Sequence, residues 1–595
     1  MTDRTGWLRR HRNLLTGLLL MLAAWAIYLP SVRFGFVYYD DVRILLNHPE
    51  LYGQANLPAD FREIFVTSFP REEPLLLRDV SWAIDSRIFG FGNAFGYHLG
   101  NVVLHGIVVA LMFAFLLGTT RRYGFALVVS IAYLVLAIHT EPVAWIMGRK
   151  DILSTLFMLL ALCAQTRRLA AENFRAQCGW YLVTLVCFMC GLLSKISVLT
   201  FPLVLFLHAI FLPYLSGKLP PDAAFAWKRN LAKEIYLFAP GFVASVLVYK
   251  WYGRTLDQMG VLDRGYTAHG LAHLWNLLMV DPLAFWIYVQ QTFFPWHLKV
   301  LYNWPAIQTW QVVISLATVA AAVATCVWLF RKHKNVFFYC GVFSVLMIPY
   351  LNFVYAGIWL AERYLYFSAF CIMAVTVSLA AAVLRSANPV ARIAVLMVGA
   401  IFLAGNLFQT FSYQPLWRNG ETLWQYHLTL PQPSHTAYEN LAACYYAEAT
   451  AQLGKPEMAV AMQKMSVVVD AGLKQFWPDR RQAPPPDTYF LFFLQSIVQE
   501  VNGEPEAALA SLLTSDQLHP KFDSTNLNLA RIYRKLASAA TDPRQKETYA
   551  SDAKDRFAEY IALAFRGRPA PPEIQKEMAD IEAEYSALTI KTSSQ

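Results

Sequence analysis

Long apolar runs recur along the first four hundred residues, and they constrain the fold more than any other feature of the sequence. A helix needs roughly 20 apolar residues to cross a bilayer, and only helices or closed barrels satisfy the backbone inside one. The chain has 595 residues, of which 56% are hydrophobic and 15% charged, too apolar for ordinary soluble domains. We therefore predict an all-α, polytopic bundle of about eleven spans. The runs lie near residues 14–30, 99–118, 124–138, 150–166, 179–193, 196–215, 235–251, 309–330, 335–351, 364–384 and 392–411.

The formal net charge of +9 could indicate nucleic-acid binding, so the positions of the basic residues matter. Threading the runs alternately through a membrane places the basic clusters on one side, which the positive-inside rule makes the cytoplasm. The charge is then a topology signal, and nucleic acid is excluded as the expected partner. The clusters are Arg9, Arg10 and Arg12; Arg121 and Arg122; Arg167, Arg168 and Arg175; Lys218, Lys228, Arg229 and Lys233; Arg331, Lys332 and Lys334; and Arg385 and Arg392.

The N-terminal run has a basic front but no small-x-small cleavage site after it, so we expect an uncleaved first span. Among the eight cysteines, Cys444 is the one expected outside the cytoplasm. The absence of paired extracytoplasmic cysteines is typical of a bacterial inner-membrane protein with a periplasmic tail. We expect a multi-pass protein with a cytoplasmic N-terminus and a periplasmic C-terminal domain.

After the last run the sequence becomes polar and Ala-rich, with helical periodicity. We expect a membrane module over 1–411, a connector over 412–432, and a soluble helical domain over 433–595. The motif "GKPEMAVA" at Gly454 recurs as "GEPEAALA" at Gly503, which suggests degenerate tetratricopeptide helix pairs. Their spacing exceeds the usual repeat of about 34 residues, and the insertion "PDRRQAPPPDTY" accounts for much of the excess. A helical domain without repeats is the alternative.

The first extracytoplasmic loop contains the acidic pair Asp40 and Asp41 in "FGFVYYDDVRILLNHPEL". Carboxylates beside a bilayer are costly unless a cation, solvent or a reacting proton compensates them, so the pair is a candidate working group. Arg78 follows in the same loop. His98 and Asn101, together with His105, share one face of the next helix because their spacing is i, i+3, i+7. For Asn101 and His105, hydrogen bonding between helices is the alternative.

The second extracytoplasmic loop, "HTEPVAWIMGRKDILS", brings His139, Glu141, Arg149 and Asp151 to a membrane entrance. Ionisable groups at such a place predict a functional site. An internal network that pairs Arg149 with Asp151 or Glu141 is the alternative.

Three further charged residues lie at the same membrane level: Lys195, Glu362 and Arg363. Lys and Arg beside acids suit a lipid-linked phosphate, because the cations neutralise the phosphate while an acid deprotonates an acceptor. Snorkelling to headgroups is the alternative for Lys195. The sequence has no GxxxxGK[ST], GxGxxG or HExxH motif. An enzyme without a nucleotide site needs an activated substrate that has already crossed the membrane, such as a polyprenyl-phosphate sugar.

Taken in order, several motifs resemble those of C-type (GT-C) membrane glycosyltransferases, and most closely those of the O-mannosyltransferase-like family with transmembrane segments and tetratricopeptide repeats. The matching motifs are "FVYYDDVRILLNHP", "GYHLGNVVLH", "HTEPVAWIMGRKDILSTLF", "LLSKISVLTFPL", "FPWHLKVLYNW", "AERYLYFS" and "LWRNGETLWQYHLTL". The resemblance implies transfer of a sugar from a lipid phosphate to an extracytoplasmic acceptor, with inversion.

The resemblance also implies roles for individual residues. Asp40 and Asp41 match the acidic pair of the family's first loop, which supplies a catalytic base or a metal-binding acid, and Glu141 matches the acid of the next loop. Arg149 and Asp151 match a "GR.D" element. Lys195 and Arg363 match residues expected near the donor phosphate, and Arg78 and Arg149 are also expected to bind that phosphate. The segment that usually reads "YRPL" is "LLRDV" here, so Arg78 is the loosest equivalent.

Adjacent carboxylates can also hold a divalent ion, so Mg²⁺ or Mn²⁺ on Asp40, Asp41 and Glu141 is a further expectation. The acceptor is expected to be a protein hydroxyl, docked by the repeat domain, since such repeats present concave binding surfaces. One alternative is an envelope lipid or glycan acceptor. Another is a non-catalytic membrane scaffold, against which the convergent ionisable groups argue.

Overall fold

The computed structural model describes residues 3–53, 62, 64, 75–223, 231–258, 274–304, 307–351, 358–385, 388–565 and 570–593. Within these ranges all regular structure is helical, as predicted. The chain divides into two compact units, Met1–Asn419 and Gly420–Gln595. The residues expected to form a connector, 412–432, contain the end of α17, a 3₁₀ turn and α18.

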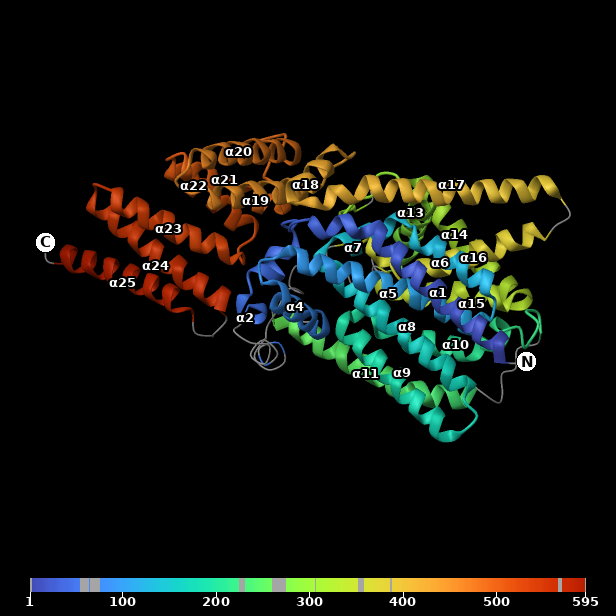
Figure 1. Ribbon diagram of the computed structural model, residues 1–595. Coiled ribbons are helices and arrows are strands. Elements are labelled where there is room, and N and C mark those ends of the chain that lie inside the picture. The colour runs from blue at the N-terminus through green and yellow to red at the C-terminus, as the bar shows by residue number, and fades with distance from the viewer. Residues whose placement is uncertain are drawn as a thin grey trace. The chain divides into compact units, whose positions relative to one another are not determined.

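Each of the eleven apolar runs falls on a helix of the first unit (Figure 1). These helices are α1 (Asp3–Tyr28), α5 (Ala94–Thr120), α6 (Tyr123–Leu134), α8 (Arg149–Ala170), α9 (Phe174–Ser194), α10 (Phe201–Leu215), α11 (Leu231–Gln258), α14 (Thr309–Lys332), α15 (Lys334–Met347), α16 (Ala369–Leu384) and α17 (Pro389–Tyr413). The described part of this unit also contains the helices α2 (Pro49–Tyr52), α4 (Leu76–Phe89), α7 (Thr140–Ala144) and α13 (Asp281–Phe293).

Six segments of the described chain are long and apolar enough to cross a membrane. A seventh crossing results if α6 and the bent segment Ala137–Ala144, which meet at 59°, form one broken span. Two further apolar helices, Lys334–Tyr350 and Ala369–Leu384, are shorter. The expected count of about eleven spans therefore stays a prediction. The six segments are His11–Arg33, Ala94–Thr120, Phe174–Ser194, Ile196–Leu215, Thr309–Lys332 and Pro389–Arg418.

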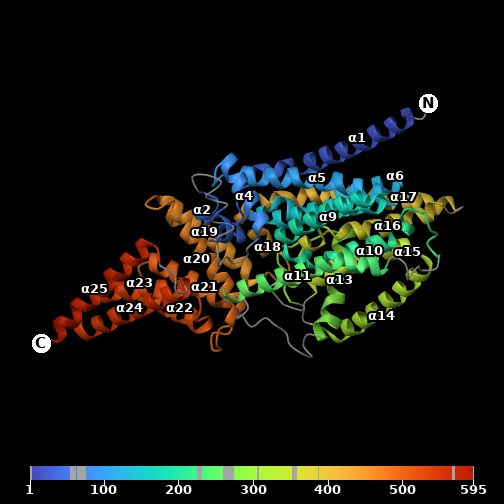
Figure 2. The ribbon, with the colours of Figure 1, turned by 90° about the horizontal axis from the view of Figure 1, so that it is seen from below.

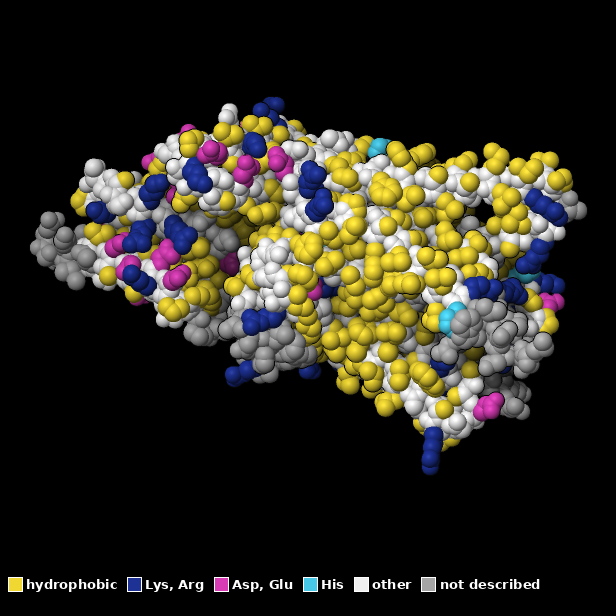
Figure 3. Space-filling model, viewed as in Figure 1, with side chains coloured by type: hydrophobic (Ala, Val, Ile, Leu, Met, Phe, Trp, Pro, Cys, Tyr) yellow, Lys and Arg dark blue, Asp and Glu magenta, His cyan; other side chains and the backbone are white. Residues whose placement is uncertain are grey.

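Helix α5 packs against α1, α6 and α8 (Figure 1, Figure 2). Its close approach to α1 depends on Gly106, since a Cβ there would lie 2.2 Å from Nε1 of Trp25. Small residues allow such close backbone packing between membrane helices. The outward faces are apolar: Leu14 and Leu19 on α1 and Val390 on α17 are exposed. Figure 3 shows a broad hydrophobic band over this unit, as expected of a lipid-facing surface.

Between the long helices α6 and α8 the chain forms a compact bent segment of short helical turns. It consists of a 3₁₀ turn (Ala137–His139), α7 and a second 3₁₀ turn (Ile146–Gly148). Every residue of this segment is buried. Gly148 closes it, because a Cβ at this position would lie 2.2 Å from the carbonyl oxygen of Pro142. The segment places Glu141 and Trp145 inside the protein.

The second unit is a series of helices in which each packs against the next. The helices are α18 (Gly420–Thr429), α19 (His435–Ala451), α20 (Pro456–Phe476), α21 (Tyr489–Val501), α22 (Pro505–Leu518), α23 (Asp523–Ala539), α24 (Pro543–Phe565) and α25 (Pro572–Ser593). Gly454 and Gly503 both adopt positive φ, 78° and 81°, just before the prolines that begin α20 and α22. The recurring motif thus marks the same kind of turn twice. The assignment as tetratricopeptide repeats stays a prediction.

Candidate functional site

Asp41 begins a π-helical turn, Asp41–Leu46, soon after the first span, and its side chain is buried, 1% exposed. One carboxylate oxygen accepts a hydrogen bond from the Val37 backbone N–H (2.9 Å), and the other accepts one from Nε1 of Trp145 (2.9 Å). Burial raises the pKa of Asp41 to about 7, although both hydrogen bonds oppose this shift. A carboxyl with such a pKa is suited to exchange protons near neutral pH.

Asp40 has a different environment from its neighbour. Its side chain is partly exposed and forms an ion pair with Arg43 at 3.0 Å. The preceding Tyr38 has a φ of 51°, in the left-handed region that non-glycine residues seldom adopt. This turn in the backbone separates an outward Asp40 from an inward Asp41.

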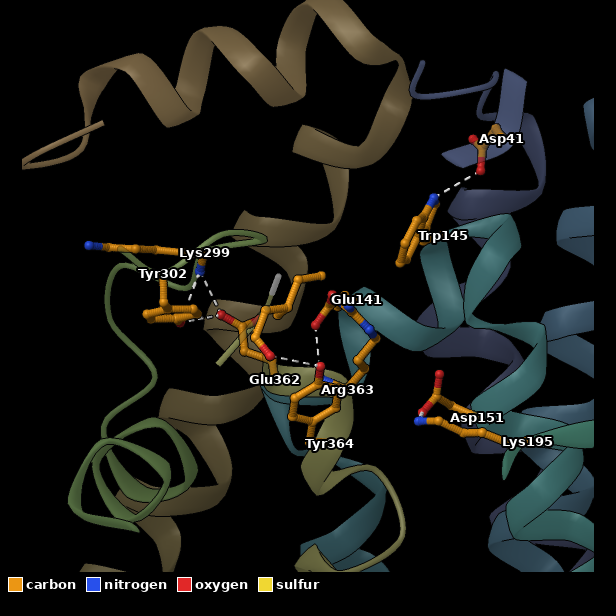
Figure 4. A network of polar contacts seen from close by, with 11 residues as sticks. Asp41, Glu141, Trp145, Asp151, Lys195, Lys299, Tyr302, Glu362, Arg363 and Tyr364 are labelled. Carbon is orange, nitrogen blue, oxygen red and sulfur yellow. Dashed lines mark hydrogen bonds and ion pairs between the residues drawn. The ribbon is translucent and has the colours of Figure 1, made fainter. Parts of the chain in front are cut away.

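The indole ring of Trp145 lies between Asp41 and a buried ion pair (Figure 4). On its far side, the guanidinium carbon of Arg363 lies 5.4 Å from the ring centroid. Arg363 forms an ion pair with Oε1 of Glu141, and its backbone N–H donates to Oε2 of the same carboxylate (2.8 Å). Tyr39 stacks on Trp145 with a centroid distance of 5.4 Å. A proton-accepting carboxylate and a cation thus flank one aromatic ring.

A second buried ion pair joins Lys195 to Asp151. The ammonium of Lys195 also lies 5.0 Å from the ring of Tyr350 and 5.6 Å from that of Tyr364, and these two rings stack at 4.2 Å. Lys195 is therefore held inside the protein, and this geometry does not support the snorkelling alternative. A cavity of about 30 Å³, lined by Asp151, Arg363, Tyr364 and other residues, lies beside this pair. It is large enough for a water molecule.

Glu362, the residue before Arg363, is fully buried and points to the other side of the chain from Glu141 (Figure 4). Its Oε1 accepts hydrogen bonds from the Lys299 backbone N–H (2.5 Å) and from the Tyr302 hydroxyl (2.8 Å). Burial and the nearby Glu141 raise the pKa of Glu362 well above its usual range.

Arg149 forms a network, but with other partners than the sequence suggested. Its guanidinium donates to Asp85 (2.7 Å), to Asn101 Oδ1 (2.5 Å) and to the carbonyl oxygen of Tyr97 (2.6 Å). A fourth contact joins it to Ser81 at 3.2 Å. Arg149 and Asn101 thus hold α4, α5 and α8 together, while the partners expected for Arg149 belong to Lys195 and Arg363.

Arg78 is also fully buried, and its guanidinium forms an ion pair with the adjacent Asp79 at 2.9 Å. Asp79 in turn accepts a hydrogen bond from the Tyr52 hydroxyl (3.1 Å). These contacts tie α4 to α2. No described contact joins Arg78 to Asp41, Glu141 or Arg363.

The predicted histidines line the buried end of α5 and the bent segment. His98 approaches the Gly35 carbonyl oxygen with Nε2 (3.2 Å), and His105 shares a hydrogen bond with the Tyr366 hydroxyl (2.7 Å). His139 packs 4.3 Å from the ring of Tyr133. All three are buried, so they connect the helices that carry the acidic and basic groups.

The carboxylates expected to hold a divalent metal do not gather into one ligand set. Asp41 and Glu141 each use both oxygens to accept N–H donors. Among the described residues, no group of three or more His, Cys, Asp or Glu side chains is placed to hold a metal ion. The described residues therefore do not fit a metal site.

The sequence interpretation missed Trp145, Tyr39, Tyr302 and Lys299. Trp145 follows Glu141 by four residues in a quoted motif, so its proximity could have been expected. The contacts of Lys299 and Tyr302 with Glu362 join segments about sixty residues apart, which no local pattern reveals.

Comparison with known proteins gives consistent relatives. "Protein O-mannosyl-transferase TMTC2" of Homo sapiens is 30% identical over 285 residues, 44% of this chain and 34% of the relative. Its counterpart in Mus musculus is 30% identical over 177 residues, 29% of this chain and 21% of the relative. "Protein O-mannosyl-transferase TMTC4" of Mus musculus is 25% identical over 275 residues, 42% of this chain and 35% of the relative.

The matched part thus spans between about a fifth and a third of these relatives' length. No protein-family model matches the chain. No solved structure matches it either. The relatives confirm the resemblance that the motifs indicated: the chain is a homologue of the TMTC protein O-mannosyl-transferases.

Proposed function

We propose that this integral-membrane protein is a glycosyltransferase that moves a sugar from a polyprenyl-phosphate donor to a protein hydroxyl on the extracytoplasmic face. Its relatives are named as protein O-mannosyl-transferases, so mannose is the first sugar to test. One observation carries the proposal. Buried Asp41 and the cation Arg363 flank the ring of Trp145. Asp41 supplies a base for the acceptor hydroxyl, and Arg363 supplies a positive charge for the donor phosphate.

In the proposed reaction, Asp41 accepts the proton of the acceptor hydroxyl as its oxygen attacks the anomeric carbon. The carbon–oxygen bond to the phosphate breaks, and the polyprenyl phosphate leaves with the bonding electrons. Attack from the face opposite the phosphate inverts the anomeric configuration. The positive charges of Arg363 and Lys195 stabilise the charge that develops on the phosphate.

Glu141 and Asp151 act through these cations. Each carboxylate forms a buried ion pair with its cation, which fixes where the positive charge lies before the donor arrives. Such preorganisation lowers the reorganisation needed during reaction. Glu141 and Asp151 are therefore positioning residues in this proposal.

The experiment uses purified protein, an envelope extract and a panel of radiolabelled polyprenyl-phosphate monosaccharides. We expect label to move from the lipid to a protease-sensitive product, and the Asp41→Asn variant to transfer it far more slowly. Adding EDTA in a parallel reaction tests whether the transfer needs Mg²⁺ or Mn²⁺. A protease-resistant product would favour the envelope lipid or glycan acceptor, and failure to bind any donor would favour the scaffold.

The location belongs to the same proposal. We place the protein in a bacterial inner membrane, with the N-terminus in the cytoplasm and the second unit in the periplasm. The basic clusters at alternate ends of the apolar runs support this orientation. We further propose that the second unit docks the acceptor, since a helical array offers an extended binding surface.

A further inference from the structure

A strap of six residues, Leu298–Asn303, crosses beside the candidate site and is anchored to it. The Lys299 backbone N–H, near its start, and the Tyr302 hydroxyl, near its end, both donate to Oε1 of Glu362 (2.5 and 2.8 Å). The Tyr302 hydroxyl also accepts a hydrogen bond from the Lys299 N–H (3.2 Å). The buried carboxylate of Glu362, the residue before Arg363, thus holds the strap in place.

The far end of the strap is fixed as well. Nε1 of Trp359 donates to the carbonyl oxygens of Tyr302 and Asn303, at 2.9 Å each. Leu298 and Val300, on either side of the lysine, are fully buried. The lysine between them is only half-buried, and burial lowers its pKa although Glu362 opposes that shift. The strap therefore presents one ammonium on a backbone held at both ends.

Charge balance distinguishes this ammonium from the other cations of the site. Arg363 is paired with Glu141, and Lys195 is paired with Asp151. Lys299 forms no ion pair with any residue that the structure describes, and its ammonium lies 5.8 Å from the ring of Tyr302. Two neutral pairs attract an anion weakly at a distance, whereas an uncompensated cation in a partly desolvated place attracts it strongly.

The strap lies among tryptophans typical of a membrane interface. Trp296 and Trp304, which precede and follow it, are 67% and 40% exposed. Trp310, in the first turn of the apolar helix α14, is 58% exposed. Exposed tryptophans concentrate at the headgroup level of a bilayer, where a lipid phosphate also lies. The surroundings of Lys299 therefore match the depth at which a lipid-linked donor carries its charge.

We propose that Lys299 and its flanking tryptophans form an entrance site that binds the phosphate of the polyprenyl donor before the sugar reaches Arg363. Figure 4 shows the Lys299 side chain extending away from Glu141 and Arg363, so this site lies outside the reaction centre. The inference rests on the proposed function for the identity of the lipid. It adds a binding residue whose loss weakens donor capture and leaves the chemical step intact.

The test measures lipid binding to the full-length protein in phosphatidylcholine nanodiscs by native mass spectrometry. The ligands are polyprenyl phosphate, uncharged polyprenol and phosphatidylglycerol. The variants are Lys299→Ala, Lys299→Arg and the matched control Lys332→Ala, an exposed lysine beside Trp328 at the other end of α14. We expect Lys299→Ala to bind polyprenyl phosphate about tenfold more weakly, as loss of a charge-assisted hydrogen bond implies. Polyprenol binding should stay unchanged, Lys299→Arg should restore affinity, and Lys332→Ala should match the wild type.

In a transfer assay the same loss should raise the KM for donor about tenfold at constant kcat. Equal polyprenyl-phosphate binding by Lys299→Ala and wild type would overturn the inference. A parallel loss of phosphatidylglycerol binding would also overturn it, since the site would then serve any anionic headgroup. Lys299-dependent binding without sugar transfer by the wild type would support the entrance site while refuting the proposed function.

Discussion

At the scale of single residues, the two adjacent aspartates of the first loop have different environments. Asp41 is buried beside Trp145, whereas Asp40 is partly exposed and paired with Arg43. We expect Asp41→Asn to lower kcat by about 10²–10⁴-fold, the range for loss of a general base. Asp40→Asn, matched in size and charge change, should keep most of the activity. Equal losses in the two variants would contradict the assignment of the base.

The pH dependence of transfer should report the same carboxyl. The raised pKa of Asp41, about 7, means that the base is protonated below neutral pH. We therefore expect kcat/KM to fall as pH decreases through about 7. The free energy of unfolding should change in the opposite direction and fall as pH rises towards 7. The reason is that Asp41 binds its proton more tightly in the native state than in the unfolded chain. The test range of pH 5.5 to 8 extends roughly one to two units around the pKa of Asp41. A kcat/KM that stays constant over this range would exclude Asp41 as the base.

Trp145→Phe tests the hydrogen bond without removing the aromatic ring. The indole N–H lowers the pKa of Asp41, so its loss should raise that pKa and shift the acidic limb of the pH profile upward. The measurement is kcat/KM against pH for variant and wild type under one set of conditions. A limb that stays in place would show that Trp145 acts only as a packing surface.

The sequence predicted that most of these residues lie near one another. It did not predict which of them form pairs. Glu141, Arg149, Asp151 and Arg363 occur in the motifs of the sequence, where the alternative of an internal network paired Arg149 with Asp151 or Glu141. The pairing itself depends on helix packing: Asp85 pairs with Arg149 from α4, which leaves Glu141 and Asp151 to other cations. No local spacing encodes that choice.

At the scale of elements, the bent segment between α6 and α8 depends on a glycine at its last position. A Cβ on Gly148 would lie 2.2 Å from the backbone oxygen of Pro142, which cannot move aside as a flexible side chain could. We expect Gly148→Ala to destabilise the protein by at least about 1–3 kcal/mol, the cost of overpacking. Gly124→Ala, with open space around its Cβ, is the control. Thermal unfolding in detergent should show a lowered midpoint for Gly148→Ala alone.

Helix positions could be predicted from the sequence because apolar runs of this length have few alternatives in a membrane. The bent segment and the strap could not, since their shapes depend on contacts with distant residues. Pro142 lies inside α7 and Gly148 directly precedes α8, but the inward direction of Glu141 comes from its bonds to Arg363. In the second unit, the repeated Gly-x-Pro turns were visible in the sequence, while the packing order of the helices was not.

At the scale of the whole molecule, the proposed orientation predicts which cysteines a membrane-impermeant maleimide reaches in spheroplasts. Gln482→Cys lies on an exposed stretch of the second unit and should be labelled without permeabilisation. Native Cys178, exposed near the basic cluster of α8 and α9, should be labelled only after permeabilisation. The reverse pattern would place the second unit in the cytoplasm and remove the proposed acceptor side.

The pair formed by Glu141 and Arg363 joins residues 222 positions apart. A ribosome therefore delivers the acid, with the bent segment around it, long before the cation that neutralises it exists. Until Arg363 emerges, Glu141 lacks the cation with which it pairs in the folded protein. A chain that terminates before Arg363 lacks this ion pair, so the site should be completed only late in synthesis.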